Sequence, residues 1–132
     1  MKATNPETKK LLPWFKEMAA LVGLDTAGVT VSLSTRNKMP YMMGGRIFLP
    51  TGLSKYTLAL SFVHELQHAR DLFDGIDLPR EEMEVRARLT EARFKKLLPS
   101  GKGESFHEVQ REKAAFDEEV RILVEAQARR AS

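Results

Sequence analysis

Apolar side chains recur at helical spacing near the start of the chain. Within residues 11–22 they fall on one side of a helix: Leu11, Trp14, Met18, Leu21 and Val22. Gly23 stands where a C-terminal cap belongs, and Thr4-Asn5-Pro6-Glu7 has the form of a capping box. Because Pro13 lacks a backbone donor and should break or restart a helix, we expect the main helix to run from Pro13 to Val22.

The next segment has the pattern of β-strands. Residues 29–34 alternate with period two and are rich in β-branched side chains. Arg46-Ile47-Phe48-Leu49 forms a second β-like stretch directly after Gly44-Gly45. We therefore expect two or three antiparallel strands in this part of the chain.

Residues 54–73 form the longest amphipathic helical pattern. Its apolar side chains fall within roughly 140° of helical arc: Leu58, Ala59, Phe62, Val63, Leu66, Ala69 and Phe73. Ser61, His64, Glu65 and His68 occupy the opposite side. A polar side that gathers both closely spaced histidines of the chain is the natural place to look for chemistry.

The chain then turns and becomes helical again. Gly75 to Pro79 is expected to be a loop, and Arg80 to Leu98 a helix. The expected buried stripe of that helix is Met83, Ala87, Thr90, Phe94, Leu97 and Leu98. After a break at residues 99–103, Ser105-Phe106-His107-Glu108 is a capping box that predicts a last helix over residues 105–130. This helix either packs behind the scaffold or covers a cleft as an appendage.

The composition places the chain among globular proteins. Its 132 residues suit one α+β domain over residues 1–132, with 42% hydrophobic and 30% charged side chains. No apolar run approaches the roughly 20 residues that a membrane span needs, and the polar start Met1-Lys2-Ala3-Thr4-Asn5-Pro6 lacks the apolar region of a signal peptide. We expect a cytoplasmic protein without membrane partners. Since the chain has no cysteine, any metal must be bound by His, Asp or Glu.

The charge balance gives little information about partners. The formal net charge is +3 and the isoelectric point is near 9.3. Basic residues alternate with glutamates, as in Arg80-Glu81-Glu82-Met83-Glu84-Val85-Arg86, which is typical of a solvated face of mixed charge. We therefore do not expect a nucleic-acid partner, and the oligomeric state stays open.

His64-Glu65-Leu66-Gln67-His68 places two histidines one turn apart on the polar side of the predicted helix. At this spacing both imidazoles can reach a single ion at about 2.0–2.1 Å. Glu65 is displaced from the ligand axis, where a carboxylate suits general-base chemistry on a water molecule. The pattern H-E-x-x-H should arise by chance in roughly one shuffled sequence in 150. It therefore favours a metal site over an exposed face that carries two histidines.

Three acidic residues are candidates for a third ligand. Asp74 would lie about 15 Å beyond His64 along a continuous helix and would be turned away from the histidines. Glu84 and Glu91 flank the same edge of the next helix about 10 Å apart, so a single ion can use only one of them. Ala87, one turn after Glu84, permits close helix approach. We therefore favour Glu84 and expect Glu91 to lie beside the site or at the surface.

The motif resembles that of the H-E-x-x-H zinc metallopeptidases, the zincins, and most closely the short gluzincin (minigluzincin-like) type. In that type a glutamate on the helix after the motif helix is the third ligand and is often followed three residues later by a small residue. Glu84-Val85-Arg86-Ala87 fits this pattern. The order of elements over residues 10–98 is also similar: an N-terminal helix, a small antiparallel sheet, the motif helix and the glutamate helix.

The resemblance implies a minimal zincin-like scaffold that cleaves peptide bonds in a peptide or protein substrate. His64, His68 and Glu84 would bind Zn²⁺, and Glu65 would be the general base. An edge strand of the sheet, here Arg46-Ile47-Phe48-Leu49, would pair with extended substrate by main-chain hydrogen bonds.

The chain departs from two related patterns. Thermolysin-like members place an aspartate four residues after the ligand glutamate to orient a histidine, and this chain has Arg88 there. A different residue must therefore orient the histidines. The metzincin pattern is also broken, because Asp71 replaces the glycine that lets the chain turn back.

Three other classes of function stay open, one of which is a purely structural helical adaptor that binds no metal. The chain could bind zinc without catalysis, as a regulatory or virion-associated module. It could also be a di-iron carboxylate oxidoreductase, since Glu65-x-x-His68 and Glu104-x-x-His107 are two Glu-x-x-His motifs and Glu17 and Glu84 are expected on other helices. The β-like segment over residues 28–50 argues against the four-helix bundle that such a centre needs.

Overall fold

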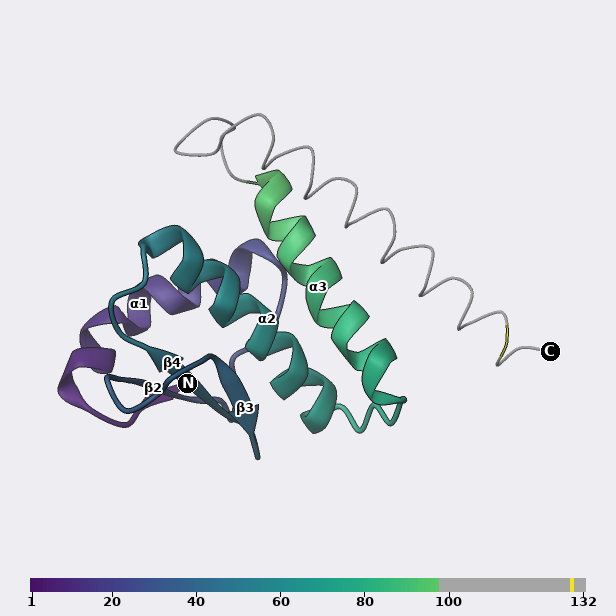
Figure 1. Ribbon diagram of the computed structural model, residues 1–132, viewed down its shortest axis with the longest axis horizontal. Helices are drawn as coiled ribbons and strands as arrows, with labels where there is room; N and C mark the ends of the chain where they lie inside the picture. The colour runs from purple at the N-terminus through teal and green to yellow at the C-terminus, as the bar shows by residue number, and fades with distance from the viewer. Residues whose placement is uncertain (98–128, 130–132) are drawn as a thin grey trace.

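The computed structural model describes residues 1–97 and residue 129 (Figure 1). In chain order its elements are β1 (Lys2–Ala3), α1 (Pro6–Leu21), β2 (Thr30–Ser34), β3 (Tyr41–Met43), β4 (Arg46–Pro50), α2 (Lys55–Phe73) and α3 (Arg80–Leu97). The expected α+β class is confirmed. The helix expected over residues 105–130 lies, apart from Arg129, outside the described residues.

The four strands form a mixed sheet in the order β1-β2-β4-β3. β1 and β4 both run parallel to β2, and only β3 and β4 are antiparallel. The expectation of an antiparallel sheet was therefore wrong. Period-two alternation identifies a strand but does not encode its direction of pairing. Here β3 pairs with the side of β4 that faces away from β2. The other side of β4 pairs with β2 in the parallel direction.

A two-residue hairpin joins β3 and β4. Gly44 and Gly45 have φ angles of 59° and 81°, and a tight hairpin with positive φ at both central positions favours glycine there. A Cβ atom on Gly45 would overlap the ring of Phe73, which stands against this turn at the end of α2. Phe73 is 44% exposed, contrary to its place in the expected stripe, because its ring covers a surface turn rather than the core.

The core lies between the inner face of the sheet and the helices α1 and α2, and α3 packs along α2 (Figure 1). Val31 pairs with Ile47 and Leu33 with Leu49, so adjacent strands present their apolar side chains together. Phe15 of α1 lies 4.6 Å from Phe62 of α2 between ring centroids. All of the expected apolar stripe of α2 is buried except Phe73.

Helix α1 departs from its expected bounds. It begins at Pro6, seven residues before Pro13, and passes through Pro13 without interruption. The cap is Asn5 rather than Thr4, because the Asn5 Oδ1 atom accepts a hydrogen bond from the Thr8 backbone N–H at 2.8 Å. Pro13 is exposed, so the carbonyl that lacks a helical partner can bind water instead.

Helices α2 and α3 match their expected bounds over the described residues. Ser54 caps α2, with its hydroxyl accepting from the Thr57 backbone N–H at 3.2 Å. In α3, Ala87, Thr90 and Phe94 are buried as expected, but Leu97 is 54% exposed. The expected stripe was wrong at Leu97 because helical periodicity identifies a face but not how far the partner helix extends along it. None of the described helices is both long enough and apolar enough to cross a membrane.

Candidate metal centre

Helix α2 carries the two motif histidines on the side that faces α3. His64 and His68 are adjacent across one helical turn, with ring centroids 5.0 Å apart. Their side chains are only 15% and 14% exposed. The apolar stripe of α2 is held against the sheet, so the imidazoles lie on the side of α2 that packs against α3, beside Glu84.

Glu84 of α3 meets both histidines. Its Oε2 atom lies 3.2 Å from His64 Nε2, and its Oε1 atom lies 3.0 Å from His68 Nε2. One potential ligand atom from each of the three residues lies within 4.8 Å of the others. Asp74, the alternative candidate, instead forms an exposed ion pair with Arg70 at 3.1 Å.

The spacing of these atoms suits a shared ion. Two ligands bound to a tetrahedral ion at about 2.0–2.1 Å lie roughly 3.3 Å from each other. Each histidine Nε2 lies 3.0–3.2 Å from one oxygen of Glu84, and one ligand atom from each of the three residues lies within 4.8 Å of the others. His68 Nε2 is buried and makes no hydrogen bond, although Glu84 Oε1 is within range, because the two groups are not aligned for one. A buried nitrogen without a hydrogen bond is costly, and a metal ion would satisfy it.

A second carboxylate orients one of the histidines. Glu91 Oε1 lies 2.8 Å from His64 Nδ1, so a protonated Nδ1 donates to this carboxylate. In the neutral ring of that tautomer, Nε2 carries the lone pair and faces Glu84. Metal-bound histidines commonly donate their other ring N–H to a carboxylate in this way. Arg88, which replaces the aspartate of thermolysin-like members, is exposed, and Glu91 takes the orienting role one turn later.

The two histidines differ in proton affinity. Burial lowers the pKa of His64, but its hydrogen bond to Glu91 and the nearby carboxylates outweigh burial and raise that pKa above its ordinary value. Burial and the charge of His64 lower the pKa of His68, although Glu84 opposes the change. Without a metal ion, His64 is therefore the histidine that holds a proton more readily.

Glu65 is a buried carboxyl group beside this cluster. Burial, reinforced by the charges of Glu84 and Glu91, raises its pKa from 4.5 to about 6, while His64 opposes the increase. It is 7% exposed and makes no hydrogen bond or ion pair with any residue in the described part of the chain. A carboxylate of raised pKa without a fixed partner is suited to exchange a proton with water.

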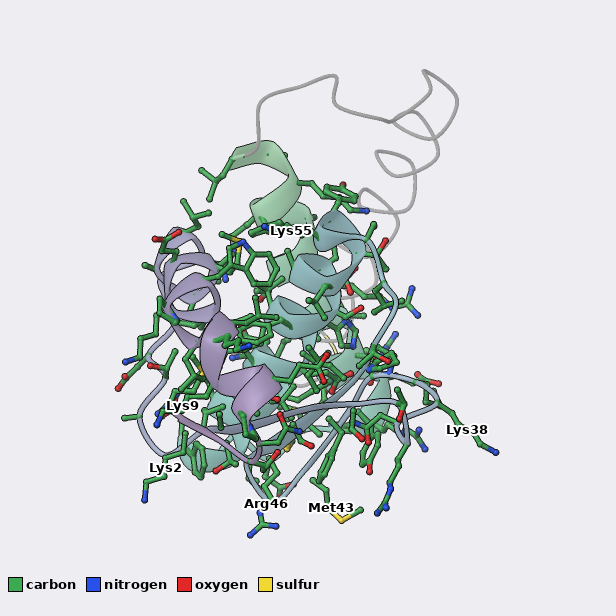
Figure 2. All side chains as sticks on the ribbon, turned by 90° about the vertical axis from the view of Figure 1, so that its left-hand side faces the viewer. Lys2, Lys9, Lys38, Met43, Arg46 and Lys55 are labelled. Carbon is green, nitrogen blue, oxygen red and sulfur yellow. The ribbon has the colours of Figure 1, made fainter. Side chains whose placement is uncertain are left out.

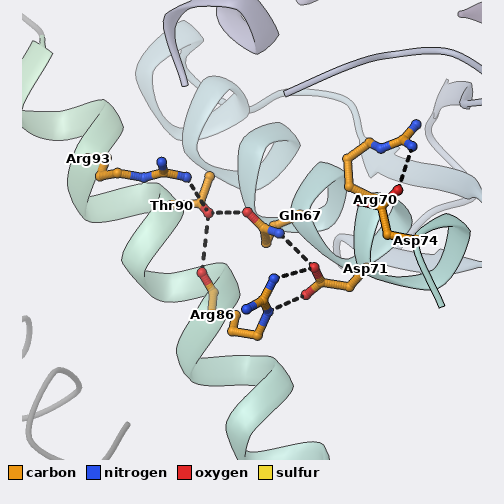
Figure 3. A network of polar contacts seen from close by, with 7 residues as sticks. All are labelled: Gln67, Arg70, Asp71, Asp74, Arg86, Thr90 and Arg93. Atoms are coloured by element: carbon orange, nitrogen blue, oxygen red, sulfur yellow. Dashed lines mark hydrogen bonds and ion pairs between the residues drawn. The ribbon is translucent and has the colours of Figure 1, made fainter. Parts of the chain in front are cut away.

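A polar network locks α3 onto α2 next to the cluster (Figure 3). Asp71 is 1% exposed and accepts hydrogen bonds from the Arg86 guanidinium at 2.8 and 2.9 Å and from Gln67 at 2.8 Å. The Thr90 hydroxyl donates to Gln67 Oε1 at 2.6 Å. The hydrogen bonds to Asp71 raise the pKa of Arg86 above its ordinary value.

Sequence reasoning missed this network, although its members follow the motif closely. Gln67 directly precedes His68 in the sequence, and Asp71 follows Gln67 by four residues. Arg86 lies two residues after Glu84. Polar side chains four residues apart on one helix are neighbours, so they can bind the same group of a partner helix. The network fixes the part of α3 from which both Glu84 and Glu91 project.

The expected substrate strand is not an edge strand. Arg46–Leu49 belongs to β4, which is paired with β2 on one side and with β3 on the other. Its main-chain groups are therefore used within the sheet, and the expectation that this segment is an edge strand was wrong. The physical reason is the tight glycine hairpin, which places β3 on the free side of β4.

The residues considered as ligands of a di-iron centre, other than Glu65, His68 and Glu84, lie apart from this cluster or outside the described residues. Glu17 is exposed on α1, and Glu104 and His107 are outside the described part of the chain. Among residues 1–97 and 129, His64, His68 and Glu84 form the only group of three side chains with metal-ligand spacing. No family model, curated protein or solved structure matches this chain. The function must therefore be argued from the site itself.

Proposed function

We propose that the protein is a zinc-dependent peptidase in which His64, His68 and Glu84 bind one Zn²⁺ ion. The observation that carries the proposal is the meeting of two imidazole nitrogens and a carboxylate from two helices, with a buried carboxyl group beside them. Two histidines and one glutamate without cysteine form a donor set of catalytic zinc, which leaves one position open.

The metal would polarise the peptide carbonyl and lower the pKa of a water molecule toward about 7. Glu65 takes the proton of the attacking water and then passes it to the leaving amine. Its raised pKa, about 6, suits both steps, because the group can accept a proton near neutral pH and release it again. Glu91 keeps the His64 ring in the orientation and tautomer that binding requires.

The free edge of β3 replaces β4 as the proposed main-chain partner of substrate. β3 (Tyr41–Met43) is paired only on its β4 side within the described residues, and it contacts α2. An extended peptide can add to such an edge by main-chain hydrogen bonds. We infer peptides or unfolded protein segments as substrates, since only an extended chain can pair in this manner.

The deciding experiment measures metal and activity together. Protein purified without chelator should carry about one zinc per chain, and His64→Ala, His68→Ala and Glu84→Ala should each lose it. Glu65→Gln should keep the zinc and lose hydrolysis of a denatured protein substrate, because the amide keeps the shape of the side chain but is not a base.

Each alternative class predicts a different result. Two bound irons per chain would contradict the peptidase proposal and favour a di-iron oxidoreductase. Bound zinc with no cleavage of any denatured protein or peptide library would favour the zinc-binding module. Loss of zinc in Glu65→Gln would make Glu65 a ligand and overturn its role as a base.

A further inference from the structure

The outer face of the sheet, opposite the helices, has a composition unlike that of the rest of the described chain. Val31, Ile47 and their neighbours point toward α1 and α2, so the alternate residues of each strand point outward. The strand register places these outward residues in rows: Lys2, Thr30, Arg46 and Met43 form one row, and Ser32, Phe48 and Tyr41 form the next. Lys2, Arg46 and Met43 project away from the helices in Figure 2.

The charge of this region is entirely positive. No acidic residue occurs between residues 26 and 64, a segment that contains β2, β3 and β4 and carries Arg36, Lys38 and Arg46. The alternation of basic and acidic residues noted for the sequence therefore holds for α3 but not for the sheet. Lys2, Arg36, Lys38 and Arg46 are exposed, and none of them forms an ion pair within the described residues.

The loop that carries two of these cations is held in place. Asn37 donates hydrogen bonds from its side-chain amide to the Ser32 and Leu49 carbonyls at 3.0 and 2.9 Å. Arg36 and Lys38 flank this anchor at one end of the sheet, and the row with Lys2 and Arg46 lies at the other. The cations thus border the outer face at both ends of the strands.

An aromatic pair lies between these cations. The rings of Tyr41 and Phe48 are stacked, with centroids 4.4 Å apart and planes 11° from parallel. They are register partners on β3 and β4. Tyr41 is 37% exposed on the edge strand, so one ring of the pair is open to solvent while its neighbour supports it.

We propose that this outer sheet face binds single-stranded nucleic acid. The bases of the nucleic acid would stack on Tyr41. Its phosphates would pair with Arg46, with Lys2 and with the cations of the 36–38 loop. An acidic peptide would use the cations but not the open aromatic ring. A duplex would need a helix or a two-stranded ribbon that enters its major groove, and the outward residues of this face lie on short paired strands of one sheet. The proposal does not depend on the metal centre, because none of the residues that it uses belongs to the cluster of His64, His68 and Glu84.

The test uses the full chain and a fluorescent oligothymidylate of about 12 nucleotides, read by anisotropy. The affinity should fall with salt, with a slope of about −2 to −3 in log–log form for three or four phosphate contacts. Arg46→Glu should weaken binding about tenfold or more, whereas Lys16→Glu, the same charge change on the exposed side of α1, should change it much less. Tyr41→Leu should weaken binding roughly tenfold, and Tyr41→Phe should keep it.

Several results would overturn the proposal. These are no binding at low salt, equal losses in Arg46→Glu and Lys16→Glu, tighter binding to polyglutamate, or tighter binding to phosphatidylserine vesicles than to the oligonucleotide. Circular dichroism and melting temperature of each variant exclude unfolding as the cause of a loss. His68→Ala should bind the oligonucleotide like the unmodified chain, which separates this face from the proposed metal site.

Discussion

Glu91 on α3 lies 2.8 Å from the Nδ1 atom of His64 on α2, on the side of the ring away from Glu84. Two glutamates seven residues apart on one helix therefore meet the two nitrogens of a single imidazole. Their distance along α3 prevents them from sharing an ion, but it suits one ligand and one orienting carboxylate. The two roles lead to different expected effects of mutation.

We predict a graded loss of zinc affinity across three acidic residues. Glu84→Ala should abolish tight binding, and Glu91→Ala should weaken it about 10- to 100-fold, the usual effect of removing a carboxylate that supports a histidine ligand. Asp74→Ala is the matched control and should leave the affinity unchanged, since among the described residues Asp74 forms its ion pair with Arg70 and not with the histidines. Competition titration with a chromophoric chelator measures all three. Equal affinity in Glu91→Ala and the unmodified chain would contradict the orienting role.

We predict that Glu65→Gln stabilises the metal-free protein at neutral pH. The pKa of Glu65 rises from 4.5 to about 6 on folding, so the folded state binds the proton more tightly than the unfolded chain does. Above pH 6 the ionised, buried carboxylate costs stability, about 2 kcal/mol for a shift of this size. The cost falls as the pH drops through 6 and disappears below 4.5, because both states then hold the proton.

Urea unfolding of both chains with chelator present measures this difference. At pH 8 the Glu65→Gln chain should be the more stable by about 2 kcal/mol, and the two should converge below about pH 4. A difference that does not vary with pH would show that the amide acts through packing rather than through charge.

We predict that Arg86→Met destabilises the fold by about 2 kcal/mol. The substitution leaves the buried Asp71 carboxylate without its cation, a loss that reaches about 3–5 kcal/mol for fully buried pairs. Arg86 is 35% exposed, so water screens part of the effect. The double variant Asp71→Asn/Arg86→Met should recover part of the stability, and additive losses in the unfolding free energy would show that the two residues do not act as a pair. The network also fixes the position of α3, which carries Glu84. Zinc affinity should therefore fall in Arg86→Met and recover in part in Asp71→Asn/Arg86→Met.

We predict that the two hairpin glycines respond differently to alanine. Both have positive φ, so each substitution should cost about 1 kcal/mol of backbone strain. Gly45→Ala should cost about 1–3 kcal/mol more, because the added Cβ overlaps the ring of Phe73, whereas Gly44 has no atom near that position. Thermal unfolding compares them, and Phe73→Leu in the Gly45→Ala chain should restore part of the loss. Equal costs at the two glycines would mean that Phe73 does not pack against the turn.

The sequence by itself determined what depends on local spacing. The motif places His64 and His68 one turn apart and Glu65 beside them through helical geometry alone, and the apolar stripe shows which side of α2 must be buried. The bounds of α2 and α3 follow from similar local signals, such as the cap at Ser54 and the glycine after Asp74. Position in the chain also limited the candidates for the third ligand to Asp74 at the end of α2 and to Glu84 and Glu91 on one edge of α3.

Only the tertiary structure decided how these elements meet. Period-two alternation could not show that β4 is a central strand, because it carries no information on the direction or number of neighbours. Pro13 was expected to interrupt α1, yet its exposed position makes the lost hydrogen bond tolerable. The assignment of Glu84 to both Nε2 atoms and of Glu91 to Nδ1 depends on how far α3 is shifted along α2. That shift is set by the Asp71–Arg86 pair and by packing, which are long-range interactions that a helical wheel cannot contain.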